Sequence, residues 1–414
     1  MSINSATEIK RELDFLPYGR QDVDDTDINR VVSVLKSDWL TQGPTVVAFE
    51  EALAKKTTAE YAVTCSNGTS ALHLTMLALG IGEGDKVVTS PVTFVASANC
   101  ARFVGAQVGF VDVDPDTALM SPEKLDEIIA KDTKRTIKAV IPVHFAGQPA
   151  DLPAIHDICS KRSIPVIDDC CHAIGAWYET KGKKHILGGN SQALMSAFSF
   201  HPVKHIACGE GGAITTADPE LYDRLCRLRN HGISREKFFN EEMAYDEFGS
   251  VNPWYHELHD LSPNYRLSDI HSALGLSQLK KLECSLERRN ILADLYDEII
   301  KDSFAPDEVR PLERRAGSYH AFHLYVLQID FERFKISRAE VMNGLRNCNI
   351  GTQVHYIPVH LQPYYRSQCG TGPGDMPNAE SYYSKALSIP MYPGLKDSDC
   401  ERVISALKAI LRPR

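Results

Sequence analysis

The sequence lacks the features that mark secreted, membrane and metal-binding proteins. Its 11 cysteines are an odd number, scattered without a C-x-x-C pair, so neither a disulfide framework nor a zinc site is indicated. No run approaches the roughly 18 apolar residues of a membrane span. The polar start, residues 1–11, has no hydrophobic core of a signal peptide. We therefore expect a soluble cytoplasmic protein with reduced thiols, no metal and no membrane partner.

The chain also lacks an excess of basic residues. It has 45 Lys and Arg against 54 Asp and Glu, a formal net charge of −9. Because neutralising phosphates requires a basic surface, this balance argues against a general nucleic-acid binder and leaves room only for a local basic pocket. There is no internal repeat and no low-complexity tract. With 414 residues, 43% of them hydrophobic, the chain can bury a substantial core, so we expect two domains or one large domain with an appendage.

Short apolar segments alternate with amphipathic ones through the first half of the chain. We expect strands at 61–65, 86–90, 107–111, 137–142 and 165–167, and helices at 94–103, 121–131 and 152–162. This alternation predicts an α/β fold, with a mostly parallel central sheet covered on both faces. Ligands of such sheets bind at the carboxyl ends of the strands. One pocket should then collect the loops that hold Gly68, Pro91, Asp168-Asp169 and the residues after His201.

The remaining pattern predicts further helices and a second, smaller domain. Helices are expected after Asp25 and at 46–55, 270–282 and 286–300, and a strand pattern restarts at 319–327. We place an N-terminal arm at 1–20, a large domain at 21–284 and a small C-terminal α/β domain at 285–414. The boundary near 285 rests on the pattern alone, because the composition shifts little.

Lys204 stands between an expected apolar strand at 193–200 and the glycine-rich turn at 209–212. Rigid backbone and partial burial at this position would lower its pKa towards neutrality, as a Schiff-base lysine requires. A solvated surface lysine is the alternative, because a lysine beside a glycine turn is a weak signal.

The stretch Ser66-Asn67-Gly68-Thr69-Ser70 predicts a turn that leads from a strand into a helix. Such a helix N-terminus presents free N–H groups and hydroxyls suited to a phosphate, although an ordinary N-cap explains the same residues. Asp168 and Asp169 end a buried strand, where a carboxylate is costly unless it meets a cation. A helix-capping role explains one of these two acids and leaves the other without a role.

A phosphate-binding turn, an aromatic residue, a carboxylate and a lysine follow one another along this α/β pattern. These are the parts needed to bind pyridoxal 5′-phosphate and to use it. The carboxylate keeps the pyridine nitrogen protonated, the aromatic residue stacks on the ring, and the lysine forms the Schiff base.

Five separate stretches carry a resemblance to a known family. They are Leu16-Pro17-Tyr18-Gly19-Arg20-Gln21, Ser37-Asp38-Trp39-Leu40-Thr41-Gln42-Gly43-Pro44, Pro142-Val143-His144-Phe145-Ala146-Gly147-Gln148-Pro149, Phe200-His201-Pro202-Val203-Lys204-His205 and Arg229-Asn230-His231-Gly232-Ile233. From about Leu16 to its C-terminus the chain resembles the DegT/DnrJ/EryC1/StrS sugar aminotransferases, of the fold-type I aminotransferase superfamily. The first two stretches resemble signatures of the branch that makes pseudaminic acid precursors.

The resemblance implies a role for each matching residue. Lys204 would form the Schiff base, and Asp169 would pair with the pyridine nitrogen. His172 would lie near the 3-hydroxyl of the cofactor and Phe94 would stack on its ring, although on composition alone both are more often core residues. The phosphate would be held by Thr69, Ser70, Ser199 and, from the neighbouring subunit of a homodimer, Asn264. Asp168 stands where the family often has glutamate, and Cys170 and Cys171 stand where small residues are usual, which we interpret as packing.

The reaction that the resemblance implies is a transamination in two halves. L-glutamate gives its amino group to the cofactor and leaves as 2-oxoglutarate. The amino group then passes to the 4-keto group of a UDP-linked 6-deoxy-N-acetylhexosamine. In both halves Lys204 carries a proton as general base and acid.

Three other functions were weighed against this one. A nicotinamide-dependent enzyme is disfavoured because the glycine-rich stretch at 80–85 precedes a strand and lacks the third glycine at its proper place. A PLP-dependent sugar dehydratase of the same family would have histidine in place of Lys204. A PLP-binding regulator would need a DNA-binding segment, and none is visible.

Overall fold

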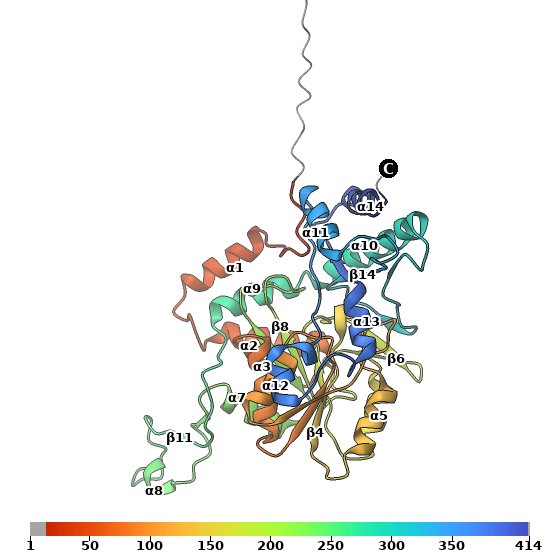
Figure 1. The fold of residues 1–414 in the computed structure, drawn as a ribbon. Coiled ribbons are helices and arrows are strands. Elements are labelled where there is room, and N and C mark those ends of the chain that lie inside the picture. The colour runs from red at the N-terminus through yellow and green to blue at the C-terminus, as the bar shows by residue number, and fades with distance from the viewer. Residues whose placement is uncertain (1–13, 413–414) are drawn as a thin grey trace, which may run out of the picture.

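Seven strands form one sheet at the centre of the large body of the computed structural model, which describes residues 14–412 (Figure 1). Three strands run in the order β3 (Gln107–Phe110), β2 (Lys86–Thr89) and β4 (Ile137–Ile141), and four in the order β5 (Ile167–Asp169), β8 (Met195–Ser199), β9 (Gly212–Thr216) and β1 (Tyr61–Cys65). Parallel bridges between Val140 and Val166 and between Val143 and Asp169 join β4 to β5. Only β9 runs antiparallel to its neighbours. The predicted mostly parallel sheet is therefore confirmed.

The strands are apolar because both faces of the sheet are buried. Successive side chains of a strand point to opposite faces, and neighbouring residues accordingly pack into two different cores. Val88, Val140 and Phe198 belong to one hydrophobic cluster. Val87, Ala139 and Ala197 belong to the other.

Helices cover each of these faces, as the alternating pattern predicts. One face is covered by α3 (Gly68–Leu79), α4 (Ala96–Phe103) and α7 (Pro219–Leu228). The other is covered by α2 (Pro44–Thr57), α5 (Pro122–Lys131), α6 (Leu152–Ser160) and α9 (Asp269–Leu279). Most observed ends lie within about two or three residues of the predicted ones, the usual uncertainty of a helix boundary. The strand expected at 165–167 is observed at Ile167–Asp169, which brings both aspartates into the last positions of β5.

A second sheet lies beside the first and is antiparallel. Its strands run in the order β12 (Val309–Pro311), β14 (Tyr325–Ile329) and β15 (Ala386–Ile389). The helices α10 (Leu282–Ser303), α11 (Arg338–Asn347) and α14 (Asp397–Leu411) pack against it in a separate hydrophobic cluster, which also contains Leu16. Residues 1–13 of the predicted arm lie outside the described residues. The division at 20 and 284 stays a prediction, with α10 beginning just before the second boundary.

The strand pattern expected at 319–327 is interrupted in the structure. Residues 318–319 form β13 (Ser318–Tyr319), which pairs with β6 (Trp177–Thr180) of a hairpin completed by β7 (Lys183–Ile186). Residues 320–324 form a loop before β14 begins. Phe322 has a φ of 46°, a left-handed conformation that a strand cannot contain. The predicted strand pattern is therefore confirmed at both ends of this range and wrong at 320–324, where the loop brings His323 into the site described below.

A long excursion between α7 and α9 projects from the body, at the lower left of Figure 1. We call residues 233–262 the projecting arm. Its base is a short antiparallel pair, β10 (Ile233–Ser234) with β11 (Glu257–Leu258), and it contains α8 (Glu241–Ala244). Large apolar side chains are exposed along it, with Phe239 84%, Phe248 85% and Leu261 92% accessible. Several large apolar side chains exposed on one segment are a feature of surfaces on which another surface packs.

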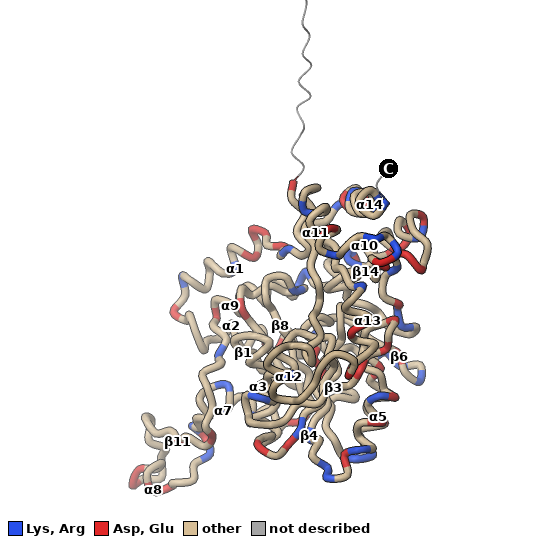
Figure 2. Tube along the Cα trace, viewed as in Figure 1, with Lys and Arg blue, Asp and Glu red and all other residues tan. Residues whose placement is uncertain are grey.

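The remaining helices lie on the outside of the fold. They are α1 (Asp25–Leu35), α12 (Pro363–Cys369) and α13 (Pro377–Lys385). Acidic and basic residues are interspersed along the outer helices α5, α10 and α14 (Figure 2). Within residues 14–412, no helix combines the length and the apolar character that crossing a membrane requires.

Candidate active site

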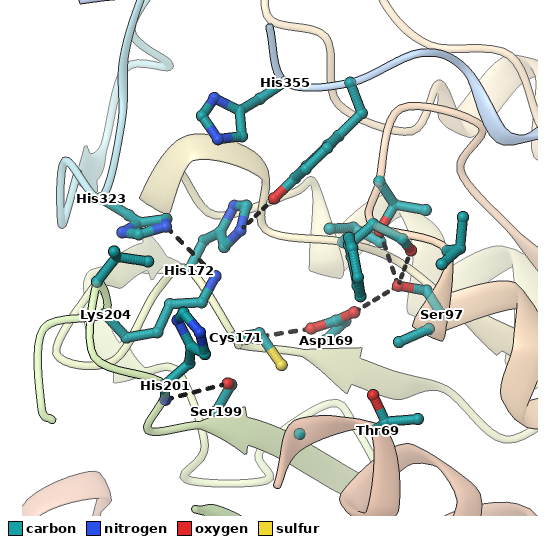
Figure 3. Close-up of a pocket in the computed structure, with 18 of the residues that line it drawn as sticks. Thr69, Ser97, Asp169, Cys171, His172, Ser199, His201, Lys204, His323 and His355 are labelled. Carbon is teal, nitrogen blue, oxygen red and sulfur yellow. Dashed lines mark hydrogen bonds between the residues drawn. The ribbon is translucent and has the colours of Figure 1, made fainter. Parts of the chain in front are cut away.

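A cavity of about 660 Å³ lies at the carboxyl ends of the parallel strands, where ligands of α/β sheets bind (Figure 3). Six of the predicted site residues line it, namely Thr69, Phe94, Asp169, His172, Ser199 and Lys204. Gly68 and His201 also line it, whereas Pro91 and Asp168 do not. The loops expected at this pocket follow β1, β2, β5 and β8, and all four reach it, the loop after β2 through Phe94 and not through Pro91.

Lys204 lies in the turn that follows β8. Its backbone N–H donates to the carbonyl of His201 at 2.8 Å, so the residue is held on an ordered turn. Burial lowers the pKa of the Lys204 amine to about 8, an effect that the nearby Cys171 and Asp169 partly oppose. A sizeable fraction of the amine is therefore neutral near neutral pH, which a nucleophile or a general base requires.

Asp169, the last residue of β5, presents its carboxylate to the cavity while remaining only 4% exposed. Its Oδ2 accepts a hydrogen bond from Oγ of Ser97 at 2.7 Å, and its Oδ1 accepts one from the backbone N–H of Cys171 at 3.1 Å. Thr93 Oγ1 lies 2.7 Å from the same Ser97 hydroxyl. Donors from α4 and from the loop after β5 therefore fix the orientation of this carboxylate.

Asp168 faces the other side of the strand and meets His144. The Nδ1 of His144 accepts a hydrogen bond from the backbone N–H of Ala150 at 3.0 Å. In the neutral ring this places the proton on Nε2, which lies 3.5 Å from Oδ1 of Asp168. Both side chains are buried. The two neighbouring acids therefore have different surroundings, one in the cavity and one in the core.

The N-terminus of α3 forms one wall of the cavity. The first N–H groups of a helix have no carbonyl of their own helix to bond, and Gly68 and Thr69 at this end both line the cavity. A Cβ on Gly68 would lie 2.8 Å from Cβ of Ser199, so only glycine allows the helix to approach the end of β8 this closely. Thr69 and Ser199 both line the cavity at this wall, and their contact with a phosphate stays a prediction.

Two predicted phosphate residues do not reach this cavity. The hydroxyl of Ser70 lies 3.0 Å from Oδ1 of Asn67 and 2.8 Å from Oγ of Ser66, and its side chain does not line the cavity. Its position serves the helix cap instead. Asn264 is exposed and pairs through its backbone with Asn230, outside the cavity of its own chain. The predicted contact of Asn264 requires a neighbouring subunit.

Another part of the cavity wall is formed by aromatic side chains. Phe94 lines the cavity with 57% of its surface exposed, and its ring centroid lies 6.1 Å from that of Tyr356. His172 Nε2 lies 3.2 Å from the hydroxyl of Tyr356. Burial, and secondarily Lys204, hold the pKa of His172 well below its usual value, so its ring is neutral. An exposed aromatic face on a cavity wall fits a flat ring.

Three residues of the site were missed by the sequence reasoning: Ser97, His323 and Tyr356. Nothing in the local sequence distinguishes Ser97 from other helix residues, and its contact with Asp169 spans 72 positions of the chain. His323 was placed inside a strand, although its Nε2 lies 3.3 Å from Nζ of Lys204. The run of histidines and aromatics at 319–325 was the one available signal for it.

An amine, a carboxylate, an aromatic face and a helix N-terminus thus surround one cavity. This set matches the four parts that pyridoxal phosphate needs, so the residues fit the predicted cofactor. A lysine at the carboxyl ends of such a sheet fits an enzyme that uses pyridoxal phosphate, a class to which the aminotransferases belong. Residues 21–408 match the model of the DegT/DnrJ/EryC1/StrS aminotransferase family, and the chain belongs to this family.

Similar proteins agree with this assignment. The spore coat polysaccharide biosynthesis protein SpsC of Bacillus subtilis (strain 168) is 39% identical over 407 residues, which cover 98% of this chain and 99% of SpsC. Among solved structures, the putative sugar aminotransferase Spr1654 from Streptococcus pneumoniae in its PLP form has a TM-score of 0.84 and 26% identity, covering 96% of this chain and 98% of its own. Helicobacter pylori PseC, an aminotransferase involved in the biosynthesis of pseudoaminic acid, has a TM-score of 0.83 and 29% identity, covering 96% and 99%.

These similarities confirm the predicted family, fold class and enzyme class. The cofactor prediction is confirmed as well, since Spr1654 also matches in a PMP form, the aminated state of the same cofactor.

Proposed function

We propose that the protein transfers an amino group to a keto sugar carried on a nucleotide, with pyridoxal 5′-phosphate as cofactor. The observation that carries the proposal is Lys204, whose amine has a pKa of about 8 and lies in one cavity with the Asp169 carboxylate. Family membership supports the transfer of an amino group. The match to Spr1654 and PseC supports a sugar as its acceptor.

The predicted site residues that line the cavity each have a part in this proposal. Thr69, Ser199 and the N-terminus of α3 hold the phosphate, Phe94 stacks on the ring, and Asp169 pairs with the ring nitrogen. When bound, the cofactor serves as an electron sink that stabilises the negative charge left when a proton is removed from the adjacent carbon. His172 lies beside the ring, where its neutral imidazole donates or accepts a hydrogen bond.

Lys204 moves the proton. Its neutral amine accepts a proton at Nζ from the carbon that bears the amino group, and the resulting ammonium returns the proton to the other carbon of the pair. A pKa of about 8 suits both directions, because near neutral pH neither form is strongly disfavoured. Burial of the site also limits the loss of this proton to water.

For the substrate we propose a UDP-linked 4-keto-6-deoxy-N-acetylhexosamine, with L-glutamate as amino donor. The product would be the 4-amino sugar nucleotide of pseudaminic acid biosynthesis, the reaction of a UDP-4-amino-4,6-dideoxy-N-acetyl-β-L-altrosamine transaminase. The two N-terminal signatures and the likeness to PseC support this choice. Tyr18, from the first signature, lines the cavity.

A second candidate is an aminotransferase of the same family that acts on another keto sugar nucleotide. The observation in its favour is the higher identity to SpsC, whose name ties that protein to spore coat polysaccharide biosynthesis. A sugar dehydratase of the family has less support, because the lysine is present at position 204.

We further propose a cytoplasmic homodimer. The projecting arm exposes Phe239, Phe248 and Leu261, and it leads directly to Asn264. A second copy that covers the arm would bring Asn264 towards the phosphate site of its partner. All 11 cysteines are free thiols, as in proteins of a reducing compartment.

The test is to incubate the purified protein with pyridoxal phosphate, L-glutamate and a panel of 4-keto sugar nucleotides, and to follow 2-oxoglutarate release. The proposal expects the fastest release with the UDP-linked N-acetylated 6-deoxy sugar. Faster release with another nucleotide or another C2 substituent would favour the second candidate. No release with any keto sugar would contradict both.

A further inference from the structure

The amine of Lys204 has a histidine neighbour that the functions assigned so far do not use. His323 Nε2 lies 3.3 Å from Nζ of Lys204, a hydrogen-bond distance (Figure 3). His323 is 5% exposed and lines the cavity from the loop at 320–324. The contact joins the region after α10 to the turn after β8, two segments 119 positions apart.

The backbone on both sides of His323 is fixed from two directions. The buried guanidinium of Arg289, on α10, donates from Nη1 to the carbonyl of Phe322 at 2.9 Å and to that of Met391 at 3.1 Å. On the other side, a Cβ on Gly147 would lie 2.8 Å from the backbone nitrogen of Phe322 and 3.0 Å from that of His323. Glycine at 147 therefore permits a close approach that leaves the loop little freedom. The imidazole is held against Lys204 by rigid neighbours.

The surroundings of His323 disfavour its protonated form. It is packed against His172, whose ring centroid is 4.4 Å away, and His205, at 5.7 Å. Burial, followed by Lys204 and these histidines and Arg289, holds the pKa of His323 well below its usual value. A proton released near this cluster therefore stays on Lys204, and the His323 ring stays neutral.

The charge state of Lys204 decides which nitrogen of His323 carries the proton. An ammonium group has three donors and no acceptor. Facing the protonated Lys204, Nε2 must therefore accept, and the proton of the neutral ring must be on Nδ1. Among the residues the structure describes, Nδ1 is buried and without a hydrogen-bond partner.

We propose that His323 is a positioning residue for Lys204, whose neutral imidazole accepts a hydrogen bond at Nε2 from Lys204 Nζ and holds this amine in place whenever it is free. The catalytic consequence rests on the proposed function. When Lys204 has accepted a proton, the ammonium remains oriented by His323 and returns the same proton. No proton passes to the imidazole, because Nζ of Lys204 both accepts the proton and returns it.

The test measures the Lys204 amine in the full-length apoprotein, without any substrate. Trace acetic anhydride is added at a series of pH values, and the acetylated fraction of Lys204 is read by peptide mapping. The wild-type midpoint is expected near the pKa of about 8. In His323→Leu the ammonium loses its acceptor while burial remains, so the midpoint should fall by about one pH unit. His323→Gln keeps an acceptor oxygen and should restore most of the difference.

A matched control is His360→Gln, which alters a buried histidine that pairs with Glu380 outside the cavity. Its Lys204 midpoint should equal that of the wild type. An unchanged midpoint in His323→Leu, or a glutamine variant that behaves like leucine, would overturn the proposal. Wild-type protein with ¹⁵N-labelled histidine gives a test that needs no folded leucine variant: NMR should show the Nδ1–H tautomer for His323, and the Nε2–H tautomer would overturn the proposal.

Turnover separates this proposal from the proposed function. If the enzyme transfers amino groups as proposed, His323→Leu should lower kcat by about ten- to a hundredfold, the effect of one lost hydrogen bond to a charged group, with the KM for the amino donor unchanged. If the wild-type protein shows no turnover, the proposed function fails, while the acetylation midpoints still decide the role of His323.

Discussion

The hydroxyl of Ser97 donates a 2.7 Å hydrogen bond to Oδ2 of Asp169 and so connects the first turn of α4 to the end of β5. Asp169 can pair with a ring nitrogen only if its carboxylate keeps its orientation, so this contact should matter for turnover. A hydrogen bond to a charged group contributes about 1.5–3 kcal/mol.

We therefore expect Ser97→Ala to lower kcat/KM by about ten- to a hundredfold, since 1.4 kcal/mol corresponds to a factor of ten. Ser97→Thr keeps the hydroxyl and is the matched control, expected to retain most of the activity. Steady-state kinetics with L-glutamate measure both. Equal losses in the alanine and threonine variants would show that packing at position 97, and not its hydroxyl, is what matters.

Mutations of the neighbouring acids Asp168 and Asp169 should have different effects on turnover and on stability. Asp169→Asn replaces the carboxylate that faces the cavity, so turnover should fall by several orders of magnitude, because only a carboxylate keeps the ring nitrogen protonated. Asp168→Asn should retain far more activity, since Asp168 faces His144 in the core. Its effect should appear instead as a loss of about 1–3 kcal/mol in the free energy of unfolding in urea. Equal losses of turnover would mean that the wrong acid was chosen.

The lowered pKa of Lys204 predicts how the stability of the apoprotein depends on pH. The pKa is about 8 in the folded protein and 10.5 in the unfolded reference, so between these values the folded state binds fewer protons. Stability then rises with pH across this window, as the cost of burying the charged amine disappears. The free energy of unfolding in urea should therefore rise more for the wild-type apoprotein than for Lys204→Met between pH 8 and 10.5. A constant difference between the two proteins would contradict the shift.

The homodimer with shared sites predicts complementation between two impaired subunits. Mixing Lys204→Ala with Asn264→Ala subunits, under conditions of exchange, gives hybrids in which one site carries both defects and the other carries neither. Activity should rise above that of either parent. Exchange that is verified by a mass tag but brings no recovery would show that each site is built from a single chain.

The fold could be predicted largely because it depends on local pattern. Strands buried on both faces are continuously apolar, and the helices between them carry capping residues such as Ser121 and Asp151 before their first turns. The positions of Lys204, Asp169 and Thr69 at strand ends followed from the same pattern, since parallel strands bring their carboxyl ends to one edge.

The contacts that orient these groups could not be predicted in this way. Ser97 meets Asp169 and His323 meets Lys204 across long stretches of chain, through side chains whose local sequence has no distinctive spacing. Residues 319–327 have the composition of a strand, but the close approach of Gly147 and the left-handed Phe322 turn their middle into a loop. Ser70 is a hydroxyl residue in the expected phosphate turn, yet its hydroxyl bonds to the capping residue Asn67 and not to the cavity.

The central claim is that Lys204 supports the transfer of an amino group from L-glutamate to a nucleotide-linked keto sugar. The most direct test is to supply L-[¹⁵N]glutamate with the 4-keto sugar nucleotide and to weigh the sugar product by mass spectrometry, with Lys204→Ala as the matched control. The account predicts one ¹⁵N atom in the sugar nucleotide for the wild type and none for the variant. A product without ¹⁵N, or one that has lost water without gaining nitrogen, would contradict it.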